Sequence, residues 1–376
     1  MKTNNAEPLI SKYLHSKAIK NGIPLAGTFE LTPRCNLNCR MCYVHLSNEE
    51  QKRRGNELTT NEWIRIATEA QKQGMLFLLL TGGEPLIRPD FPELLSELKK
   101  LGLMISVNSN GTLLNDAIID KIKKDPPFRF NITLYGASDE TYLRLCGRPV
   151  FGTVMENIRK LKESGVGVKL NASITPYNCR DLGSIYKLSQ ELDCPIQAST
   201  YMFPPIRRDE SFVGTNDRFS WQEAASNSVR WDLLRFDRET FRSRAEALLN
   251  CGTIPDERLC EDVPGEGVMC RAGRSSFWIN WKGDMTPCGM MNEPCSSVTE
   301  KGFSLAWNET RTATSKIKLP SLCTNCNLKQ ICHICAAMCL TETGKFGKNP
   351  EYVCKMTEEI VRLTKHEYER IVENDN

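Results

Sequence analysis

The sequence lacks long apolar runs and a strong charge of either sign. Near the first cysteine-rich segment, the run from Met75 to Leu80 is far shorter than the roughly 20 apolar residues of a membrane-spanning helix. The first eight residues hold no apolar core of the kind that secretory signals contain. A formal net charge of +3 is too small to indicate binding to DNA, RNA or an anionic membrane. We therefore expect a cytoplasmic protein that binds neither nucleic acid nor a membrane.

Cysteine, by contrast, is abundant, with 17 residues in a chain of 376. In a reducing compartment this abundance favours metal ligation over disulfides. Cys35, Cys39 and Cys42 follow a short strand-like stretch in a Cys-x3-Cys-x2-Cys pattern. Three thiolates can hold three corners of a four-iron cube, and cubane clusters otherwise take four cysteines. The pattern therefore predicts a cluster in which one iron has no protein ligand and is open to another molecule. A vacant coordination position likewise distinguishes a catalytic zinc site from a structural one.

A zinc knuckle is the alternative for this segment. Zinc sites need a fourth ligand and are usually built from Cys-x2-Cys pairs. His45 is the only candidate nearby, and a solvated loop histidine is the simpler interpretation of that residue.

Short β-rich runs alternate with longer helical patterns from residue 27 to about residue 201, which is typical of βα units and a parallel sheet. We predict a partial (β/α)6 barrel of the TIM type, with its chemistry on loops at the carboxyl ends of the strands. The pattern Thr59 to Glu62 predicts a capping box at a helix start. The expected strands are 28–31, 76–80, 103–108, 130–134, 168–174 and 196–200, and the expected helices are 61–73, 91–101, 115–123, 152–162 and 181–192.

The chain length exceeds the usual size of one hydrophobic core, so it predicts one large barrel, two domains, or both together. We expect an N-terminal extension (1–25), a barrel (26–250) and a cysteine-rich C-terminal domain with a terminal helix (251–376). Residues 220–249 read as one or two helices that pack on the barrel, and the Pro- and Gly-rich segment 256–267 reads as a linker.

At Cys35, Cys39 and Cys42 the sequence resembles the radical SAM superfamily. The resemblance implies a [4Fe-4S] cluster whose open iron binds S-adenosylmethionine. One electron from the cluster would then cleave the sulfonium to a 5′-deoxyadenosyl radical. It also implies an electron donor such as a flavodoxin or ferredoxin, and a cofactor-binding role for Tyr43, which follows the third cysteine.

Residues 81–85, Thr-Gly-Gly-Glu-Pro, come directly after the second expected strand. Two glycines allow the backbone to approach a ligand closely. The segment resembles the GGEP motif of the superfamily, which implies that Gly82, Gly83 and Glu84 hold the amino group of S-adenosylmethionine. The resemblance also implies ribose or carboxylate contacts near Thr133 and Asn171. Many relatives show Ser-x-Asp-Gly where this chain has residues 133–136, so the ribose contact could be altered or the segment could be an ordinary turn.

The C-terminal cysteines resemble the SPASM extension, which binds two auxiliary [4Fe-4S] clusters. Cys270 precedes an expected hairpin over residues 276–283, and Cys288 lies five positions beyond Gly283. By this resemblance, the first auxiliary cluster would take Cys270, Cys288 and Cys335, and the second would take Cys323, Cys326, Cys332 and Cys354.

The spacing departs from the SPASM pattern at one point. Two residues separate Cys332 from Cys335 where three are usual, so Cys335 and Cys339 compete for one role. A further ligand for the first auxiliary cluster could be Cys260, or that position could be open to substrate. A pair of zinc sites is the alternative for the Cys-x2-Cys pairs.

Many SPASM proteins modify peptides, so the resemblance implies a substrate that is a ribosomally made peptide and receives a crosslink or a related modification. Sulfatase maturation is disfavoured because Gly289 stands where that subgroup has an aspartate after the hairpin cysteine. The segment 201–208, with aromatic residues, Arg207 and Arg208, suits the lining of a peptide groove. Only about thirty residues precede Cys35, so recognition of a leader peptide would need a standalone partner or the barrel surface.

Two alternatives share these cofactors, namely a small-molecule dehydrogenase and a peptide epimerase. An epimerase needs a thiol that returns hydrogen to the substrate, and a structural buried thiol is the competing interpretation for each candidate. A non-enzymatic iron–sulfur or zinc protein, serving electron transfer or interaction, is the alternative from another class. The candidate hydrogen-donor thiols are Cys146, Cys179, Cys194, Cys251 and Cys295.

Overall fold

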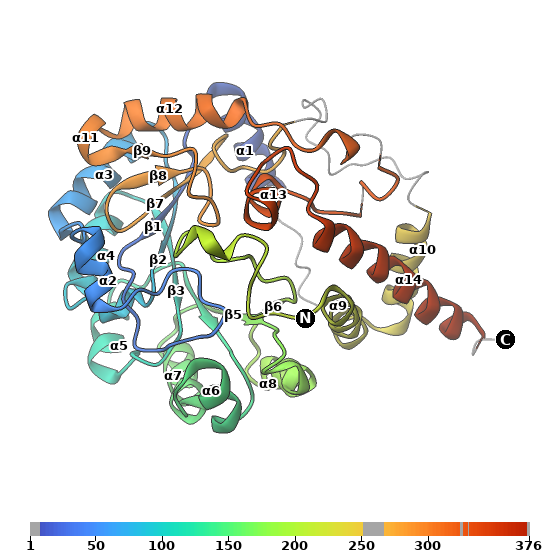
Figure 1. The fold of residues 1–376 in the computed structure, drawn as a ribbon. Helices are drawn as coiled ribbons and strands as arrows, with labels where there is room; N and C mark the ends of the chain where they lie inside the picture. The colour runs from blue at the N-terminus through green and yellow to red at the C-terminus, as the bar shows by residue number, and fades with distance from the viewer. Residues whose placement is uncertain (1–7, 251–266, 324–325, 330, 374–376) are drawn as a thin grey trace.

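A computed structural model describes residues 8–250, 267–323, 326–329 and 331–373. Its centre is a single nine-stranded sheet in the order β6-β5-β4-β3-β2-β1-β7-β8-β9 (Figure 1). The first six strands are all parallel, and β7 adds to the free edge of β1, also in parallel. The strands are β1 (Ala26–Glu30), β2 (Phe77–Thr81), β3 (Met104–Ser109), β4 (Arg129–Thr133), β5 (Val168–Ser173), β6 (Ile196–Ser199), β7 (Ser276–Ile279), β8 (Asp284–Thr286) and β9 (Ser296–Ser297).

Helices cover the outer side of the parallel strands (Figure 1). Helix α3 begins at the predicted capping box, in which Thr59 Oγ1 accepts from the Glu62 N–H and the Glu62 carboxylate accepts from the Thr59 N–H. The helices up to β6 are α1 (Leu9–Asn21), α2 (Asn48–Arg54), α3 (Thr60–Lys72), α4 (Phe91–Lys100), α5 (Asp116–Ile122), α6 (Asp139–Cys146), α7 (Phe151–Glu163) and α8 (Leu182–Glu191).

The two faces of the parallel sheet differ in polarity. Leu80, Val107 and Phe130 are in register on the outer face and are fully buried in the core with the helices. On the opposite face the alternate residues of β4 and β5 are polar, and Asn131 Nδ2 donates to Asn108 Oδ1 of β3 at 2.8 Å. This polar inner face, at the carboxyl ends of the strands, is where barrels of this type carry their chemistry.

The C-terminal part is built on the β7–β8 hairpin and six helices. Helix α14 packs along α9 and α10, and α12 packs on α3 (Figure 1). These helices are α9 (Trp221–Arg235), α10 (Arg238–Leu249), α11 (Val298–Lys301), α12 (Phe303–Ser315), α13 (Ala336–Thr343) and α14 (Glu351–Glu373).

The predicted parallel α/β architecture with six strands is confirmed, and each expected strand lies within two residues of an observed one. Residues 220–249 form two helices, α9 and α10. Most of the expected linker, 256–267, lies outside the described residues, and the proposed domain boundaries stay predictions. Within the described ranges, no helix has the length and apolar character needed to cross a membrane.

A buried ion pair joins the segment after β6 to the C-terminal helices. Arg218 donates to both carboxylate oxygens of Glu342, at 2.6 and 2.8 Å, and both side chains are about 5% exposed. The guanidinium stacks 3.8 Å from the ring centre of Tyr352, and the Tyr201 hydroxyl donates to Glu342 at 2.6 Å. The Glu342 carboxylate holds the pKa of Arg218 above its usual value, against the opposing effect of burial.

We expect Arg218→Met to lower the free energy of unfolding by about 3–5 kcal/mol, because Glu342 would stay buried without its cation. Chemical denaturation of the full chain measures the loss. Lys187→Ala breaks the exposed Lys187–Glu191 pair and should cost less than about 1 kcal/mol. Equal losses in the two variants would contradict this role for Arg218.

Candidate active site

The loop that carries Cys35, Cys39 and Cys42 leaves the carboxyl end of β1 and is tied to the glycine turn (residues 82–85) after β2. The Gly83 N–H donates to Thr32 O at 2.7 Å, and the Glu84 N–H donates to Arg34 O at 2.9 Å. These bonds extend the β1–β2 pairing beyond the strands. The cysteine loop (residues 35–42) and the glycine turn are therefore positioned as one unit.

Gly82 and Gly83 have a packing role in addition to the predicted one, which is to let the backbone approach a ligand closely. A Cβ at Gly82 would lie 2.6 Å from Thr32 O, and a Cβ at Gly83 would lie 2.3 Å from Arg34 O. Both distances are far below van der Waals contact. Any larger residue would push the glycine turn away from the cysteine loop.

Glu84 is fully buried and accepts three hydrogen bonds. Its donors are the Asn110 N–H (2.7 Å), the Ser109 hydroxyl (2.9 Å) and the Leu86 N–H (3.1 Å). Burial nevertheless raises the pKa of the Glu84 carboxyl to about 7. The carboxylate links the ends of β2 and β3, a connection that the sequence pattern alone does not indicate.

The three thiols of the cysteine loop influence one another electrostatically, because the charge of one thiolate disfavours ionisation of the next. Burial raises the pKa of Cys35 to about 12, and the neighbouring Cys39 and Cys42 add to this rise. The pKa of Cys39 lies well above its usual value because of a hydrogen bond with Cys146 and because of burial. The pKa of Cys42 is also raised, chiefly by burial. Three adjacent thiolates need a strongly cationic group to be stable there, and this donor set fits a [4Fe-4S] cluster.

In a [4Fe-4S] cluster each cysteine binds a different iron, whereas all the ligands of a zinc ion converge on one metal atom. Among the residues that the structure describes, no three His, Cys, Asp or Glu side chains converge closely enough for a single ion. His45, the candidate fourth zinc ligand, is half-buried, and its N–H donates to Cys42 Sγ at 3.2 Å.

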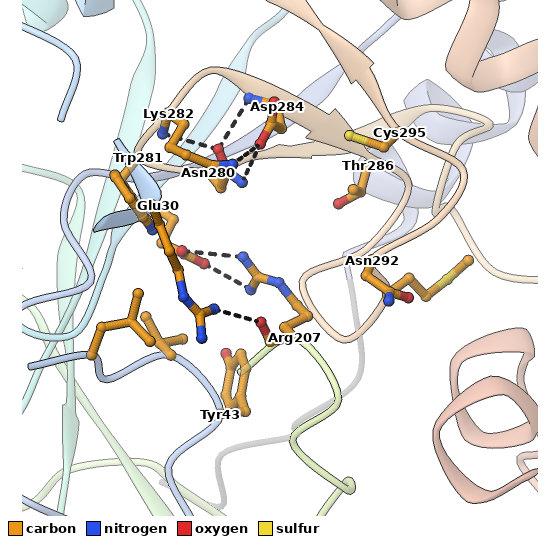
Figure 2. A pocket seen from close by; sticks show the side chains of 14 residues that line it. Glu30, Tyr43, Arg207, Asn280, Trp281, Lys282, Asp284, Thr286, Asn292 and Cys295 are labelled. Carbon is orange, nitrogen blue, oxygen red and sulfur yellow. Dashed lines mark hydrogen bonds and ion pairs between the residues drawn. The ribbon is translucent and has the colours of Figure 1, made fainter. Parts of the chain in front are cut away.

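Tyr43 is half-buried between the cysteine loop and the Cys288 region. Burial raises its pKa, and the charges of Glu30, Cys42 and Cys288 act in the same direction. Nearby, Arg207 donates to both Glu30 oxygens (2.8 and 3.1 Å) and to Gly289 O (2.8 Å). Figure 2 shows Tyr43, Glu30 and Arg207 around one cavity.

Segment 201–208, which the sequence predicts to line a peptide groove, supplies Arg207 to the cavity. Glu30 neutralises Arg207, and the Arg208 guanidinium donates to Cys42 O at 3.0 Å. The peptide groove itself stays a prediction. Sequence reasoning also missed Glu30 and Trp278, whose Nε1–H donates to Glu30 at 3.0 Å. An isolated acidic residue at the end of an apolar strand was the signal available for Glu30.

The cavity beside Tyr43 has a volume of about 170 Å3. It does not reach the sulfurs of the cysteine loop but begins at the next residue along the chain. Its walls are Glu30, Tyr43, Val44, Leu46, Arg54, Arg207, Asn280, Trp281, Lys282, Asp284, Thr286, Met291, Asn292 and Cys295 (Figure 2).

Thr133 and Asn171 are register partners at the ends of β4 and β5 and lie on the polar inner face. Both are partly exposed, and Asn171 O accepts from the Leu134 N–H at 2.8 Å. The structure thus brings the two together, and their contact with a cofactor stays a prediction.

The C-terminal cysteines fall into two groups whose members influence one another electrostatically. The pKa of Cys335 is raised to about 11 by burial, and Cys270 and Cys288 contribute to the rise. Cys339 is fully buried on α13, and burial raises its pKa to about 12 with contributions from Cys335 and from the second group. The first group is Cys270, Cys288 and Cys335, and the second is Cys323, Cys326, Cys332 and Cys354.

The remaining thiols occupy different surroundings. Cys146 is fully buried next to Cys39, and Cys194 is buried between α8 and β6. Cys179 is half-buried, whereas Cys295 is exposed and borders the cavity. Cys251 and Cys260 lie outside the described residues.

Comparison with known proteins agrees with this geometry. The model of the Radical SAM superfamily matches residues 29–188, which contain the end of β1, the cysteine loop, the glycine turn and β2–β5. Residues 29–188 belong to the radical SAM superfamily. The match supports a radical SAM enzyme, for which the family implies a [4Fe-4S] cluster and S-adenosylmethionine. The assignment of Cys35, Cys39 and Cys42 as the cluster ligands stays a prediction.

Similar proteins span most of the chain. It is 24% identical over 347 residues to an AdoMet-dependent heme synthase of Methanosarcina barkeri, which covers 88% of this chain and 96% of that one. Streptococcus suis SuiB bound to its precursor peptide SuiA has a TM-score of 0.68 at 18% identity, over 94% of this chain and 84% of that one. The protein anSMEcpe, solved with AdoMet and the Cp18Cys peptide, has a TM-score of 0.67 at 17% identity, over 93% of this chain and 99% of that one. The likeness to the two solved structures concerns the fold.

We expect Cys35→Ala and Cys42→Ala each to lose about four irons per chain after anaerobic reconstitution, because two thiolates cannot hold the cube. Iron and sulfide analysis measures the loss, and reductive cleavage of S-adenosylmethionine should vanish with it. Cys194→Ala removes a buried thiol elsewhere in the barrel and is the matched control. Full iron content in both loop variants would refute the assignment of these ligands.

Proposed function

We propose that this radical SAM enzyme abstracts hydrogen from a ribosomally made peptide and installs a crosslink or a related modification. The observation that carries the proposal is the position of Tyr43 and the small cavity between the cysteine loop and the first C-terminal cysteine group. When bound, the cluster with S-adenosylmethionine supplies one-electron cleavage of a sulfonium and thereby a carbon radical. The protein's task is to bind, orient and exclude water.

The size of the cavity favours a peptide over a tetrapyrrole. A volume of about 170 Å3 falls below the roughly 300–1,000 Å3 of pockets for drug-sized ligands. One amino-acid side chain fits such a space, whereas a macrocycle does not. The fold likeness to two proteins solved with peptides, over more than nine-tenths of this chain, supports the same substrate class.

Residues at the carboxyl ends of β2, β4 and β5 would bind S-adenosylmethionine. Glu84 would face the amino group of S-adenosylmethionine, since a nearby cation stabilises the charged form of a buried carboxylate. Gly82 and Gly83 keep the glycine turn against the cysteine loop, and Thr133 and Asn171 would contact the ribose or the carboxylate. Tyr43 separates the cofactor from the substrate cavity.

The two C-terminal groups would hold auxiliary [4Fe-4S] clusters of the SPASM type. Cys335 lies with Cys270 and Cys288, so we assign the disputed position to Cys335 and leave Cys339 as a buried neighbour of both groups. With three described ligands, the first group would need a further ligand such as Cys260, or it would stay open to substrate. A flavodoxin or ferredoxin would supply electrons in the cytoplasm, and a standalone protein could present the leader peptide.

A small-molecule reaction is the second candidate, because the heme synthase relative aligns with nearly the whole chain. A peptide epimerase is a variant of the first proposal in which Cys295, exposed beside the cavity, would return hydrogen. A purely electron-carrying protein would not cleave S-adenosylmethionine at all.

We expect peptides encoded beside this gene to stimulate formation of 5′-deoxyadenosine by the reconstituted enzyme, with a mass change in the peptide. Deuterium at the modified position should appear in 5′-deoxyadenosine, because the hydrogen is taken from substrate carbon. An iron porphyrin serves as the competing probe, because the relative in Methanosarcina barkeri is a heme synthase, and the Cys35→Ala variant is the inactive control. Stimulation and mass change with the porphyrin alone would replace the peptide proposal by the small-molecule one.

For the auxiliary clusters, we expect Cys288→Ala and Cys326→Ala each to lose up to about four irons while the S-adenosylmethionine-responsive cluster persists. Electron paramagnetic resonance of the reduced protein distinguishes that cluster by its response to S-adenosylmethionine. Cys295→Ala, in the same region of the chain, should keep its iron. Unchanged iron content in both Cys288→Ala and Cys326→Ala would contradict the two auxiliary clusters, and only the cluster on the cysteine loop would remain in the proposal.

A further inference from the structure

The pre-cysteine segment (residues 31–34) joins β1 to the cysteine loop. All four of its carbonyl oxygens accept hydrogen bonds, at distances between 2.7 and 3.1 Å. In the order of the four carbonyls, the donors are Arg88 Nη1, the Gly83 N–H, the Leu46 N–H and the Glu84 N–H. Two of these donors belong to the glycine turn. The position of that turn relative to the cysteines therefore depends on how firmly the pre-cysteine segment is held.

Glu57 holds the side chains of this segment from the connector between α2 and α3. Its Oε1 accepts from the Thr32 hydroxyl at 2.5 Å and from Arg34 Nε at 2.7 Å, and its Oε2 accepts from Arg34 Nη2 at 2.9 Å. The Thr32 hydroxyl in turn accepts from the Arg34 N–H at 3.1 Å. One carboxylate thus fixes the two residues whose carbonyl oxygens the glycine turn uses.

The connector that carries Glu57 is itself fixed on two sides. The Leu58 N–H donates to Trp281 O in the β7–β8 hairpin at 2.9 Å, and Leu58 O accepts from Arg88 Nη1 at 3.0 Å. Arg88 is buried, and its Nε and Nη2 donate to Asp90 at 3.0 and 2.7 Å. Its Nη1 also lies 3.7 Å from Glu57 Oε2. The Glu57 carboxylate is therefore held between two arginines on a connector with little freedom to move.

No superfamily motif that the sequence displays includes Glu57, which lies 15 positions beyond Cys42. We propose that Glu57 is a positioning residue for S-adenosylmethionine. It acts through Thr32 and Arg34, and it holds the glycine turn where binding of the cofactor requires it. Residues that orient the ligands of a metal site in this indirect way contribute roughly 10–100-fold to affinity or activity. The role rests on the proposed binding of S-adenosylmethionine at the glycine turn and is independent of whether the substrate is a peptide.

Removal of the Glu57 carboxylate leaves no buried charge without a partner. Arg88 keeps its two bonds to Asp90. The Arg34 side chain is 32% exposed, so water can hydrate its guanidinium. We therefore expect the Glu57→Ala variant to fold and to bind iron, because its cysteines are unchanged. The expected defect is confined to the glycine turn and to the cofactor that this turn binds.

Equilibrium binding of S-adenosylmethionine to the anaerobically reconstituted full chain tests the proposal. We expect Glu57→Ala to weaken binding by about tenfold while the iron and sulfide contents stay at the wild-type level. Glu57→Gln keeps one acceptor oxygen and should weaken binding less. Thr32→Val removes only the hydroxyl and should weaken binding in the same direction. Glu93→Ala, which removes an exposed carboxylate on α4, is the matched control and should bind S-adenosylmethionine like the wild type.

Hydrogen exchange of the reconstituted protein, before S-adenosylmethionine is added, gives a second readout. The Gly83 and Glu84 N–H groups should exchange faster in Glu57→Ala than in the wild type, because the carbonyl oxygens that accept from them are held less firmly. Exchange in β4 should stay unchanged. Neither measurement needs a substrate, so a negative result with peptides leaves both readouts intact.

Wild-type affinity for S-adenosylmethionine in Glu57→Ala at full iron content would overturn the proposal. Faster exchange in β4 as well as in the glycine turn would assign Glu57 to general stability and would also overturn it. If Glu57→Ala loses iron, the comparison moves to Glu57→Gln and Thr32→Val, and wild-type affinity in both would overturn it. Failure of the wild-type chain to bind S-adenosylmethionine would overturn the proposed function together with this role.

Discussion

Three thiols buried together at the carboxyl end of β1 impose the constraint on which the rest of the site depends. Burial and neighbouring thiols raise the pKa of Cys35 and Cys42, and Cys146 together with burial raises that of Cys39, so the site favours protonated thiols until a cationic group binds. Iron must therefore displace protons, and the fold must hold the loop ready for it. Two backbone bonds from the glycine turn and two from the end of α6 meet that requirement, because they fasten the loop on opposite sides.

The C-terminal part of the chain reaches the candidate active site through β7. Strand β7 pairs with β1 in parallel, so the segment that leads to Cys288 begins beside the strand that leads to Cys35. Arg207 then links Glu30 of β1 to Gly289, the residue after Cys288. The neighbouring Arg208 donates to Cys42 O. Two consecutive arginines thus fix the cysteine loop and the Cys288 region relative to each other, and Arg207 also borders the cavity beside Tyr43.

The sequence predicted those features that depend on local pattern. The six parallel strands, the α3 capping box and the two helices after residue 220 follow from hydrophobic periodicity and from side chains within a few positions of one another. The pairing of β7 with β1 did not follow, because it joins segments 250 residues apart. Nor did the Glu30–Arg207 pair, whose partners are 177 positions apart. The sequence offered Cys146 only as a candidate hydrogen-donor thiol or a buried structural thiol, because its place next to Cys39 depends on how α6 returns to the loop.

The central claim is that Cys35, Cys39 and Cys42 hold a cluster whose fourth iron binds S-adenosylmethionine directly. Electron–nuclear double resonance of the reduced enzyme with S-adenosylmethionine carrying 15N at the amino group and 17O at the carboxylate tests it most directly. The account predicts hyperfine coupling of both nuclei to the cluster, which is lost in the Cys35→Ala variant. A reduced cluster with S-adenosylmethionine bound but without either coupling would contradict it.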